Sequence, residues 1–261
     1  MKVLIVGDIV GSSGVQRLKK EYKKISEEQK IDFFIVNGEN SAAGKGLRVK
    51  EYDEIMALGV DCITMGNHLY YRKEMAPKYK ELKNLLIPSN INNLVGNGST
   101  VIEKFGKKFA VINIIGKAGM GDILSEAITS PFDAVINEIN RVNEQGANCI
   151  FVDFHAEATA EKIAMSYFLK DKVTCLFGTH THVQTADEKI FDTGMAYITD
   201  VGMTGPINSV IGLKTELALK RFVNGEYAKY ECSDNESCFC AIILEIDDIT
   251  NKCVKIERIN R

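Results

Sequence analysis

The stretch Lys2-Val3-Leu4-Ile5-Val6-Gly7-Asp8 is a continuous apolar run that ends in a glycine and a carboxylate. Such a run is expected of a strand buried on both faces, as in a parallel sheet covered by helices. Open α/β sheets collect ligands in the crevice beyond the carboxyl ends of their strands. The stretch therefore predicts an α/β fold with a functional site that begins at Asp8.

Strand and helix patterns alternate over the first two-thirds of the chain. Helical spacing of apolar residues predicts helices over 14–30, 49–58, 72–82, 131–145 and 159–169. Apolar runs predict strands over 2–7, 32–37, 61–65, 148–154 and 172–177, and a hairpin over 99–105 and 108–115 that turns at 106–107. Beyond Gly178 we expect short strands over 189–191, 196–199, 227–232, 238–246 and 254–259, and one helix over 213–222.

This order of elements predicts two sheets, the first mainly parallel and the second mixed, packed face to face with helices outside. The chain has 261 residues, of which 45% are apolar, and this suits one large core. No linker or internal repeat divides it, so residues 1–261 are read as one domain. Residues 116–130 lack periodicity and are expected to form a loop near the site.

Composition excludes several classes of protein. The net charge of −3 gives no basic stripe for nucleic acid, and no apolar run is long enough to span a membrane. The N-terminus becomes acidic too early for a signal peptide. Seven scattered cysteines favour a reducing, cytoplasmic setting. Four of them lie near the C-terminus, where small buried side chains are favoured over a structural zinc site.

All four histidines occur in three short motifs that follow predicted strands. The motifs are Gly66-Asn67-His68, the segment 152–155, and Gly178-Thr179-His180-Thr181-His182. Two further strand ends carry Asp8 and Glu39-Asn40. The candidate metal ligands are Asp8, Glu39, Asn40, Asn67, His155, His180 and His182. This mixed nitrogen and oxygen set suits iron, manganese or zinc rather than calcium, and it leaves His68 for acid–base chemistry.

Three local motifs have more than one possible interpretation. The segment Gly11-Ser12-Ser13-Gly14 follows a strand, as in a dinucleotide site, but its glycine spacing is not G-x-G-x-x-G, and the histidines would be unexplained. Glu39-Asn40 alone is equally compatible with a loop that caps a helix. Asp153 points to the same side of its strand as His155, so it is either the partner of His155 or a solvent contact.

The order of these motifs resembles that of the calcineurin-like metallophosphoesterases. Longer strings at 37–46, 153–159, 178–187 and 198–206 closely resemble the bacterial YmdB-like branch, and the likeness extends from Met1 to about Arg258. The resemblance implies a four-layer α/β sandwich. It also implies a metal-dependent phosphodiesterase that acts on cyclic nucleotides, both 2′,3′-cyclic and 3′,5′-cyclic.

The resemblance also implies a role for each motif residue. Two metal ions are expected, iron foremost, with manganese or zinc as alternatives. The first ion would be held by Asp8, Glu39, Asn40 and His182, and the second by Glu39, Asn67, His155 and His180. Glu39 would bridge the two ions, and His68 would be the proton donor.

The chain departs from the related sequences at two places. Val10 stands where the wider superfamily has a histidine, a loss that the YmdB-like branch shares. Tyr70-Tyr71 stands where the branch usually has Trp-Asp, which leaves the substrate preference open. The two tyrosines either stack a base or pack the rim of the site.

Three functions therefore remain under consideration. The first is the cyclic-nucleotide phosphodiesterase, and the second is a phosphomonoesterase or protein phosphatase at the same site. The third is a regulatory protein that binds metal and nucleotide and hydrolyses only incidentally. The retained His68 favours an enzyme, because a sensor needs no proton donor. Homo-oligomerisation is left open.

Overall fold

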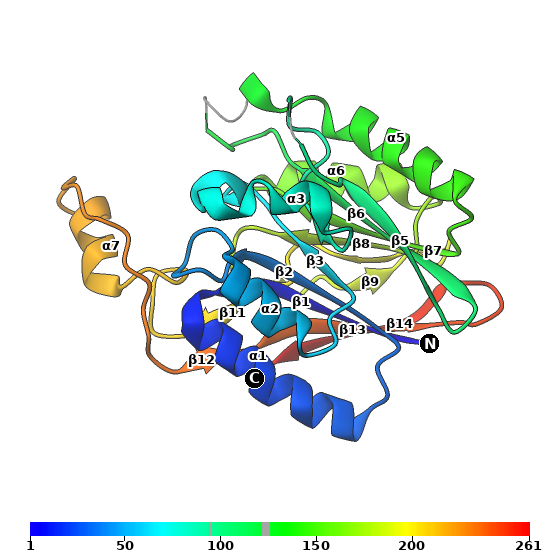
Figure 1. Ribbon diagram of the computed structural model, residues 1–261, viewed down its shortest axis with the longest axis horizontal. Coiled ribbons are helices and arrows are strands. Elements are labelled where there is room, and N and C mark those ends of the chain that lie inside the picture. Colours follow the sequence, from blue (N-terminus) through cyan, green and yellow to red (C-terminus); the bar gives the residue numbers. More distant parts are fainter. Residues whose placement is uncertain (94, 122–125) are drawn as a thin grey trace.

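The computed structural model describes residues 1–93, 95–121 and 126–261. Two mixed sheets lie between outer helices (Figure 1). The described helices are α1 (Gly11–Glu28), α2 (Val49–Met56), α3 (Lys78–Glu81), α5 (Pro131–Glu144), α6 (Thr159–Leu169) and α7 (Thr215–Phe222), with the 3-10 turns η1 (Leu69–Tyr71) and η2 (Lys73–Met75). None of these helices is both long and apolar enough to cross a membrane.

The first sheet has the order β12-β11-β1-β2-β3-β4; in addition, β13 pairs with β1, and β14 pairs with β13. Its strands are β1 (Lys2–Val10), β2 (Phe33–Asn40), β3 (Cys62–Thr64), β4 (Leu85–Leu86), β11 (Met203–Pro206), β12 (Ser237–Cys238), β13 (Cys240–Ile246) and β14 (Cys253–Asn260). β1 to β4 and β11 run parallel, while β12, β13 and β14 pair antiparallel with their neighbours.

The second sheet has the order β5-β6-β7-β8-β10-β9. Its strands are β5 (Ser99–Lys104), β6 (Lys107–Ile115), β7 (Cys149–His155), β8 (Cys175–Thr179), β9 (Lys189–Ile190) and β10 (Ala196–Ile198). The four central strands are parallel and both edge strands are antiparallel. The two parallel centres confirm the expected pair of mixed sheets.

Three apolar cores separate four layers. Along β1, Val3 and Ile5 belong to the core between the sheets, whereas Leu4 and Val6 belong to the core under the outer helices. This alternation follows from the two-residue period of a strand. A third core joins the other face of the second sheet to α5 and α6. The chain thus forms the α/β/β/α sandwich that the resemblance implies.

Local sequence explains where several elements begin and end. Ser130 caps α5 by accepting a hydrogen bond from the backbone N–H of Asp133 (3.3 Å), and Pro131 occupies the first turn. The predicted helix over 72–82 is wrong: it is broken into η2 and α3 at Pro77. Proline has no N–H to continue a helical ladder, and this accounts for the break.

Other expectations also need correction. The predicted strand over 227–232 is irregular and forms a bridge only between Leu213 and Cys232. The hairpin turns at Phe105-Gly106 rather than 106–107, and both residues have positive φ (54° and 72°), as a two-residue hairpin turn requires. In the predicted loop over 116–130, residues 122–125 lie outside the described residues.

Candidate active site

The five motifs meet at one edge of the molecule. Asp8 lies in β1, and Glu39 and Asn40 end β2 in the first sheet; Asn67 and His68 follow β3. His155 ends β7, and His180 and His182 follow β8 in the second sheet. We call these eight side chains the strand-end cluster. Because each sheet supplies only part of the cluster, the face-to-face packing of the two sheets assembles it.

Asp8 fastens the two sheets together at this edge. The pairing of β1 with β2 shifts register on both sides of Asp8, and such bulges re-aim a side chain. The Oδ2 atom of Asp8 accepts a hydrogen bond from the backbone N–H of His180 (3.0 Å). Asp8 therefore belongs to the cluster and also positions residues 180–182, which we call the histidine loop.

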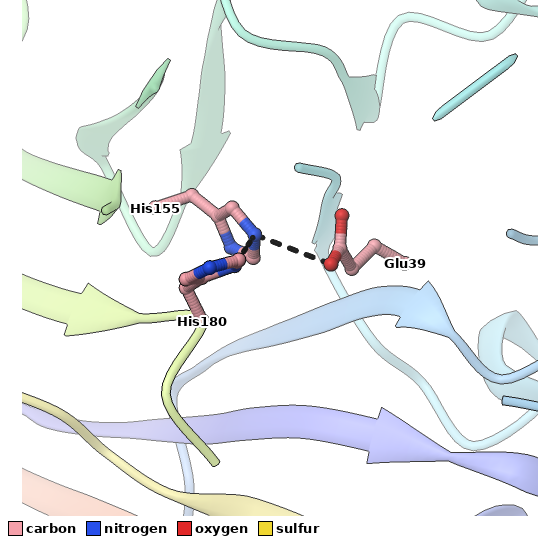
Figure 2. Close-up of side chains that lie close together, drawn as sticks. All are labelled: Glu39, His155 and His180. Atoms are coloured by element: carbon pink, nitrogen blue, oxygen red, sulfur yellow. Dashed lines mark hydrogen bonds and ion pairs between the residues drawn. The ribbon is translucent and has the colours of Figure 1, made fainter. Parts of the chain in front are cut away.

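Glu39 occupies the centre of the cluster. Its Oε1 atom lies 3.2 Å from Nε2 of His155 and 3.2 Å from Nδ1 of His68. The Nδ1 atom of His180 lies 3.0 Å from the same nitrogen of His155 (Figure 2). In the described part of the chain, Glu39, His155 and His180 are the one group of acidic, histidine or cysteine side chains placed to share a metal ion.

A second set of donor atoms gathers around Asn40. Its Nδ2 atom lies 3.0 Å from Nε2 of His182, 3.4 Å from Oδ1 of Asp8 and 3.2 Å from Oε1 of Glu39. Three electron-pair donors thus converge on one point. The oxygen and nitrogen of a side-chain amide are assigned from such contacts. Rotating the Asn40 amide by half a turn would place its oxygen, instead of Nδ2, at this point.

Hydrogen bonds fix how His180 and His182 are oriented. Nδ1 of His182 lies 2.9 Å from the carbonyl oxygen of Ile211, which can only accept, so Nδ1 carries the proton and Nε2 keeps its lone pair. Nε2 of His180 lies 3.1 Å from the carboxylate of Glu157 and donates to it, which leaves Nδ1 unprotonated. Burial and the neighbouring His155 lower the pKa of His180 to about 3, so this ring is neutral.

His155 is oriented through a threonine. The hydroxyl of Thr179 donates to Oδ1 of Asp153 (2.7 Å), and it has no second proton, so it accepts from Nδ1 of His155 (2.9 Å). Nε2 of His155 then faces Glu39 and the Oδ1 atom of Asn67 (2.9 Å). Of the two interpretations of Asp153, the solvent contact is wrong, because the residue is fully buried. Asp153 is a partner of His155, but an indirect one that acts through Thr179.

The electrostatics of the cluster favour a bound cation. Burial raises the pKa of Asp8. Burial alone would also raise the pKa of Glu39, but His155 and His68 hold it well below its usual range. Burial opposes a charge on His155, yet Glu39 and Asp8 raise its pKa to about 9. Two buried carboxylates thus draw a proton onto the nearest base, and a metal ion would supply that charge and release the proton.

Gly66 lets the backbone pass directly against the cluster. A Cβ atom at this position would lie 2.3 Å from Oε2 of Glu39 and 2.3 Å from Nε2 of His155. Any larger residue would push these two groups aside. The glycine of this motif is therefore a packing requirement of the site.

A buried ion pair, missed in the sequence, braces the histidine loop. Nζ of Lys162 donates to Oδ2 of Asp200 (2.7 Å) and to the backbone oxygen of Thr179 (2.8 Å). Asp200 also accepts from the backbone N–H of Thr181 (3.1 Å) and of Gly202 (2.8 Å). The sequence offered one indication of this ion pair, because Lys162 lies on the apolar face of the helix predicted over 159–169.

His68 lies at the open side of the cluster. Its Nδ1 atom lies 2.8 Å from Oδ1 of Asn40 and its backbone N–H donates to Oε2 of Glu39 (3.1 Å). With Nδ1 and the backbone both engaged, Nε2 is the ring atom left for another partner. The side chain is 24% exposed, so this atom can reach a bound molecule.

A cavity of about 380 Å³ opens over the strand-end cluster. Glu39, His68, His180 and His182 form part of its lining. Tyr70 and Tyr71 are not among its described lining residues; Tyr71 contacts the edge of His68 instead, with ring centroids 6.2 Å apart. A second hollow, of about 450 Å³, lies at the opposite ends of β7 and β8 and contains no histidine among its described residues.

The structure gives no support to two alternatives from the sequence. At the glycine-rich turn after β1, a Cβ on Gly14 would lie 2.3 Å from the backbone oxygen of Thr204, and one on Gly11 would lie 2.6 Å from Sγ of Cys232. Both glycines are therefore explained by close packing within the protein, and nothing in the turn calls for a dinucleotide. Within the described residues, no three cysteines are placed to share a zinc ion.

The fold is that of the calcineurin-like phosphoesterases. A 5′-nucleotidase structure from Candida albicans shares it at a TM-score of 0.58 and 13% identity, over 99% of this chain and 50% of that one. At such low identity the likeness concerns the fold alone.

The chain belongs to the YmdB-like protein family, whose sequence profile matches residues 4–259. It is 40% identical to a 2′,3′-cyclic-nucleotide 2′-phosphodiesterase of Bacillus subtilis (strain 168), over 99% of this chain and 96% of that protein. It also superposes on the crystal structure of a novel phosphatase from Mycoplasma pneumoniae at a TM-score of 0.93 and 34% identity, over 100% and 93% of the two chains.

Proposed function

We propose that this chain hydrolyses 2′,3′-cyclic nucleotides at the strand-end cluster, with two metal ions bound there. Its family and its 40% identity to a cyclic-nucleotide phosphodiesterase make it a hydrolase that acts on phosphodiesters. The observation that carries the metal centre is the orientation of three imidazoles. Each of the three donates from one ring nitrogen. The other nitrogen faces Glu39 in His155, His155 in His180, and Asn40 and Asp8 in His182.

Two ligand sets follow from this arrangement. Asp8, Glu39, Asn40 and His182 would hold one ion, and Glu39, Asn67, His155 and His180 the other. Glu39 belongs to both sets because its Oε1 atom lies within 3.2 Å of Asn40 on one side and of His155 on the other. A mixed nitrogen and oxygen set favours iron, with manganese or zinc as alternatives.

The bound ions supply positive charge to the phosphate and lower the pKa of a water molecule. Hydrolysis would add the hydroxide part of one water molecule to phosphorus and break the bond from phosphorus to one ribose oxygen. His68, held through Nδ1, gives a proton from Nε2 to the departing oxygen. The remaining proton of the water would pass to solvent, from which His68 regains the proton that it donates. The B. subtilis relative is named for the 2′ bond, so we propose that a 3′-nucleotide is formed here too.

All seven cysteines lie in described residues and are free thiols. Disulfides are rare in reducing compartments, so we place this reaction in the cytoplasm.

The deciding experiment compares kcat/KM for 2′,3′-cAMP, 3′,5′-cAMP and 3′-AMP, with iron or manganese supplied. We expect 2′,3′-cAMP to be the best of the three, because its strained ring starts nearer the transition state. Faster hydrolysis of 3′-AMP would instead support a phosphomonoesterase, the alternative that the name of the M. pneumoniae structure favours. Binding without turnover of any substrate would support the regulatory alternative.

A further inference from the structure

The cavity over the cluster has a second wall, which belongs to a projecting segment. We call residues 207–231 the α7 lobe; it extends from the end of β11 and carries α7 at the left edge of Figure 1. Of the residues in α7, the helix buries Ala218. The Ile211 oxygen of this lobe accepts the hydrogen bond from His182, so the lobe touches the cluster directly.

The wall supplied by the lobe is apolar and aromatic. Its lining residues are Val210, Ile211, Leu213, Arg221, Phe222 and Tyr230. A phosphate gains no favourable contact from such a surface. A flat heterocyclic base does, because every base has a π face that can stack on an aromatic ring. The cavity volume of about 380 Å³ lies within the range of roughly 300–1,000 Å³ that is usual for small-molecule sites.

Two cationic side chains also line the cavity, one of them within the lobe itself. Lys45 lines the cavity, with Nζ 5.1 Å from the ring centre of Tyr230 and 5.5 Å from that of Tyr71. Arg221 is held by a hydrogen bond from Nε to the backbone oxygen of Ala228 (2.9 Å) and also lines the cavity. Both side chains can donate charge-assisted hydrogen bonds to the oxygens of a ribose phosphate, which is negatively charged.

We propose that the α7 lobe is the nucleoside-binding wall of the site. The base packs against Phe222 and Tyr230, the sugar-phosphate oxygens lie toward Lys45 and Arg221, and the phosphate reaches the strand-end cluster. This assignment rests on the proposed function and replaces Tyr70-Tyr71 as the stacking surface. It makes the lobe the element that selects phosphodiesters bearing a base.

The test uses two substrates with the same reacting group. One is 2′,3′-cAMP, and the other is methyl riboside 2′,3′-cyclic phosphate, which has no base. Phe222→Ala should lower kcat/KM for 2′,3′-cAMP about tenfold, mostly through KM, as expected for a lost stacking contact. For the base-free substrate the loss should be less than about threefold, because this substrate lacks the base that Phe222 is proposed to contact. Removing the base and removing Phe222 would delete the same interaction, so their effects on kcat/KM should not be additive in free energy.

Tyr227→Ala is the matched control, since Tyr227 is an aromatic residue of the same lobe, 93% exposed and outside the cavity lining. It should change neither reaction. Equal losses on both substrates for Phe222→Ala, or an equal effect of the control, would overturn the assignment.

Calorimetric binding of 3′-AMP separates this proposal from the proposed function. If the protein turns over no cyclic nucleotide, Phe222→Ala should still weaken 3′-AMP binding about tenfold. Unchanged affinity would overturn the nucleoside wall whether or not the enzyme is a cyclic-nucleotide phosphodiesterase.

Discussion

The strand-end cluster and the α7 lobe face the same cavity but are built differently. Asp8, Glu39 and His155 are at most 1% exposed and are held by polar contacts between the two sheets. In the lobe, Phe222 is 81% and Tyr227 93% exposed. The groups proposed to react are therefore fixed by the buried frame, whereas the surface proposed to recognise the substrate carries exposed side chains. Substitutions should accordingly have large effects in the first region and small ones in the second.

The largest effect is expected for Glu39→Gln. The neutral amide removes the carboxylate that both proposed metal sites share, so turnover should be abolished and the content of both metals should fall. Elemental analysis of the purified variant measures this directly. Glu226→Gln, on the exposed surface of the lobe, is the control and should retain metal and activity. Two metals per chain in Glu39→Gln would refute the bridging role.

His68→Ala should keep the metals and lose turnover by about 10²–10⁴-fold, the usual contribution of a general acid. The loss should shrink for a diester that releases p-nitrophenolate, because this leaving group needs little protonation. Steady-state kinetics on both substrates checks this. The same loss on each would mean that His68 positions the phosphate rather than donating a proton.

Thr179→Val tests the hydrogen-bond chain behind the cluster. Valine has a similar shape but cannot link Asp153 to His155, so metal affinity should fall about 10- to 100-fold, as for other residues that orient metal ligands. Thr174→Val is the matched control, because Thr174 accepts from the N–H of Ile150 at the opposite ends of the same strands. Metal titration of both variants decides, and equal affinities would exclude an orienting role for Thr179.

The smallest effect is expected in the lobe. Tyr227→Ala should change the free energy of unfolding by less than about 0.5 kcal/mol, as is usual for exposed positions. Phe154→Ala, in the core between β7 and the outer helices, should cost about 3–5 kcal/mol. Denaturant unfolding of both variants measures the contrast. A large loss for Tyr227→Ala would show that the lobe is part of the cooperative fold.

The residues of the cluster could be predicted because strand ends concentrate unusual residue types. Glycine, carboxylate and imidazole each stand out against an apolar run, and parallel strands bring their carboxyl ends to one edge. The sandwich followed from the alternation of buried strands and helices. These features are local in sequence, so periodicity and spacing reveal them.

What could not be predicted depends on contacts between distant segments. Lys162 and Asp200 are ordinary residues until folding pairs them. β11 is short and contains glycine and proline, and it is a strand because β1 and β12 pair with it. Residues 227–232 alternate like a strand, but among the described residues they pair only through the isolated bridge between Cys232 and Leu213. The lining of the cavity likewise combines segments that are far apart in the sequence, from Lys45 to Tyr230.

The histidine loop has one further consequence. His180 and His182 both have positive φ (101° and 65°), a conformation that costs non-glycine residues about 1–3 kcal/mol each. Hydrogen bonds to Asp8, Lys162 and Asp200 hold this backbone conformation from within the protein. We therefore expect ions to exchange at the site without refolding of the loop, so that the supply of metal in the cell decides which ion the enzyme carries.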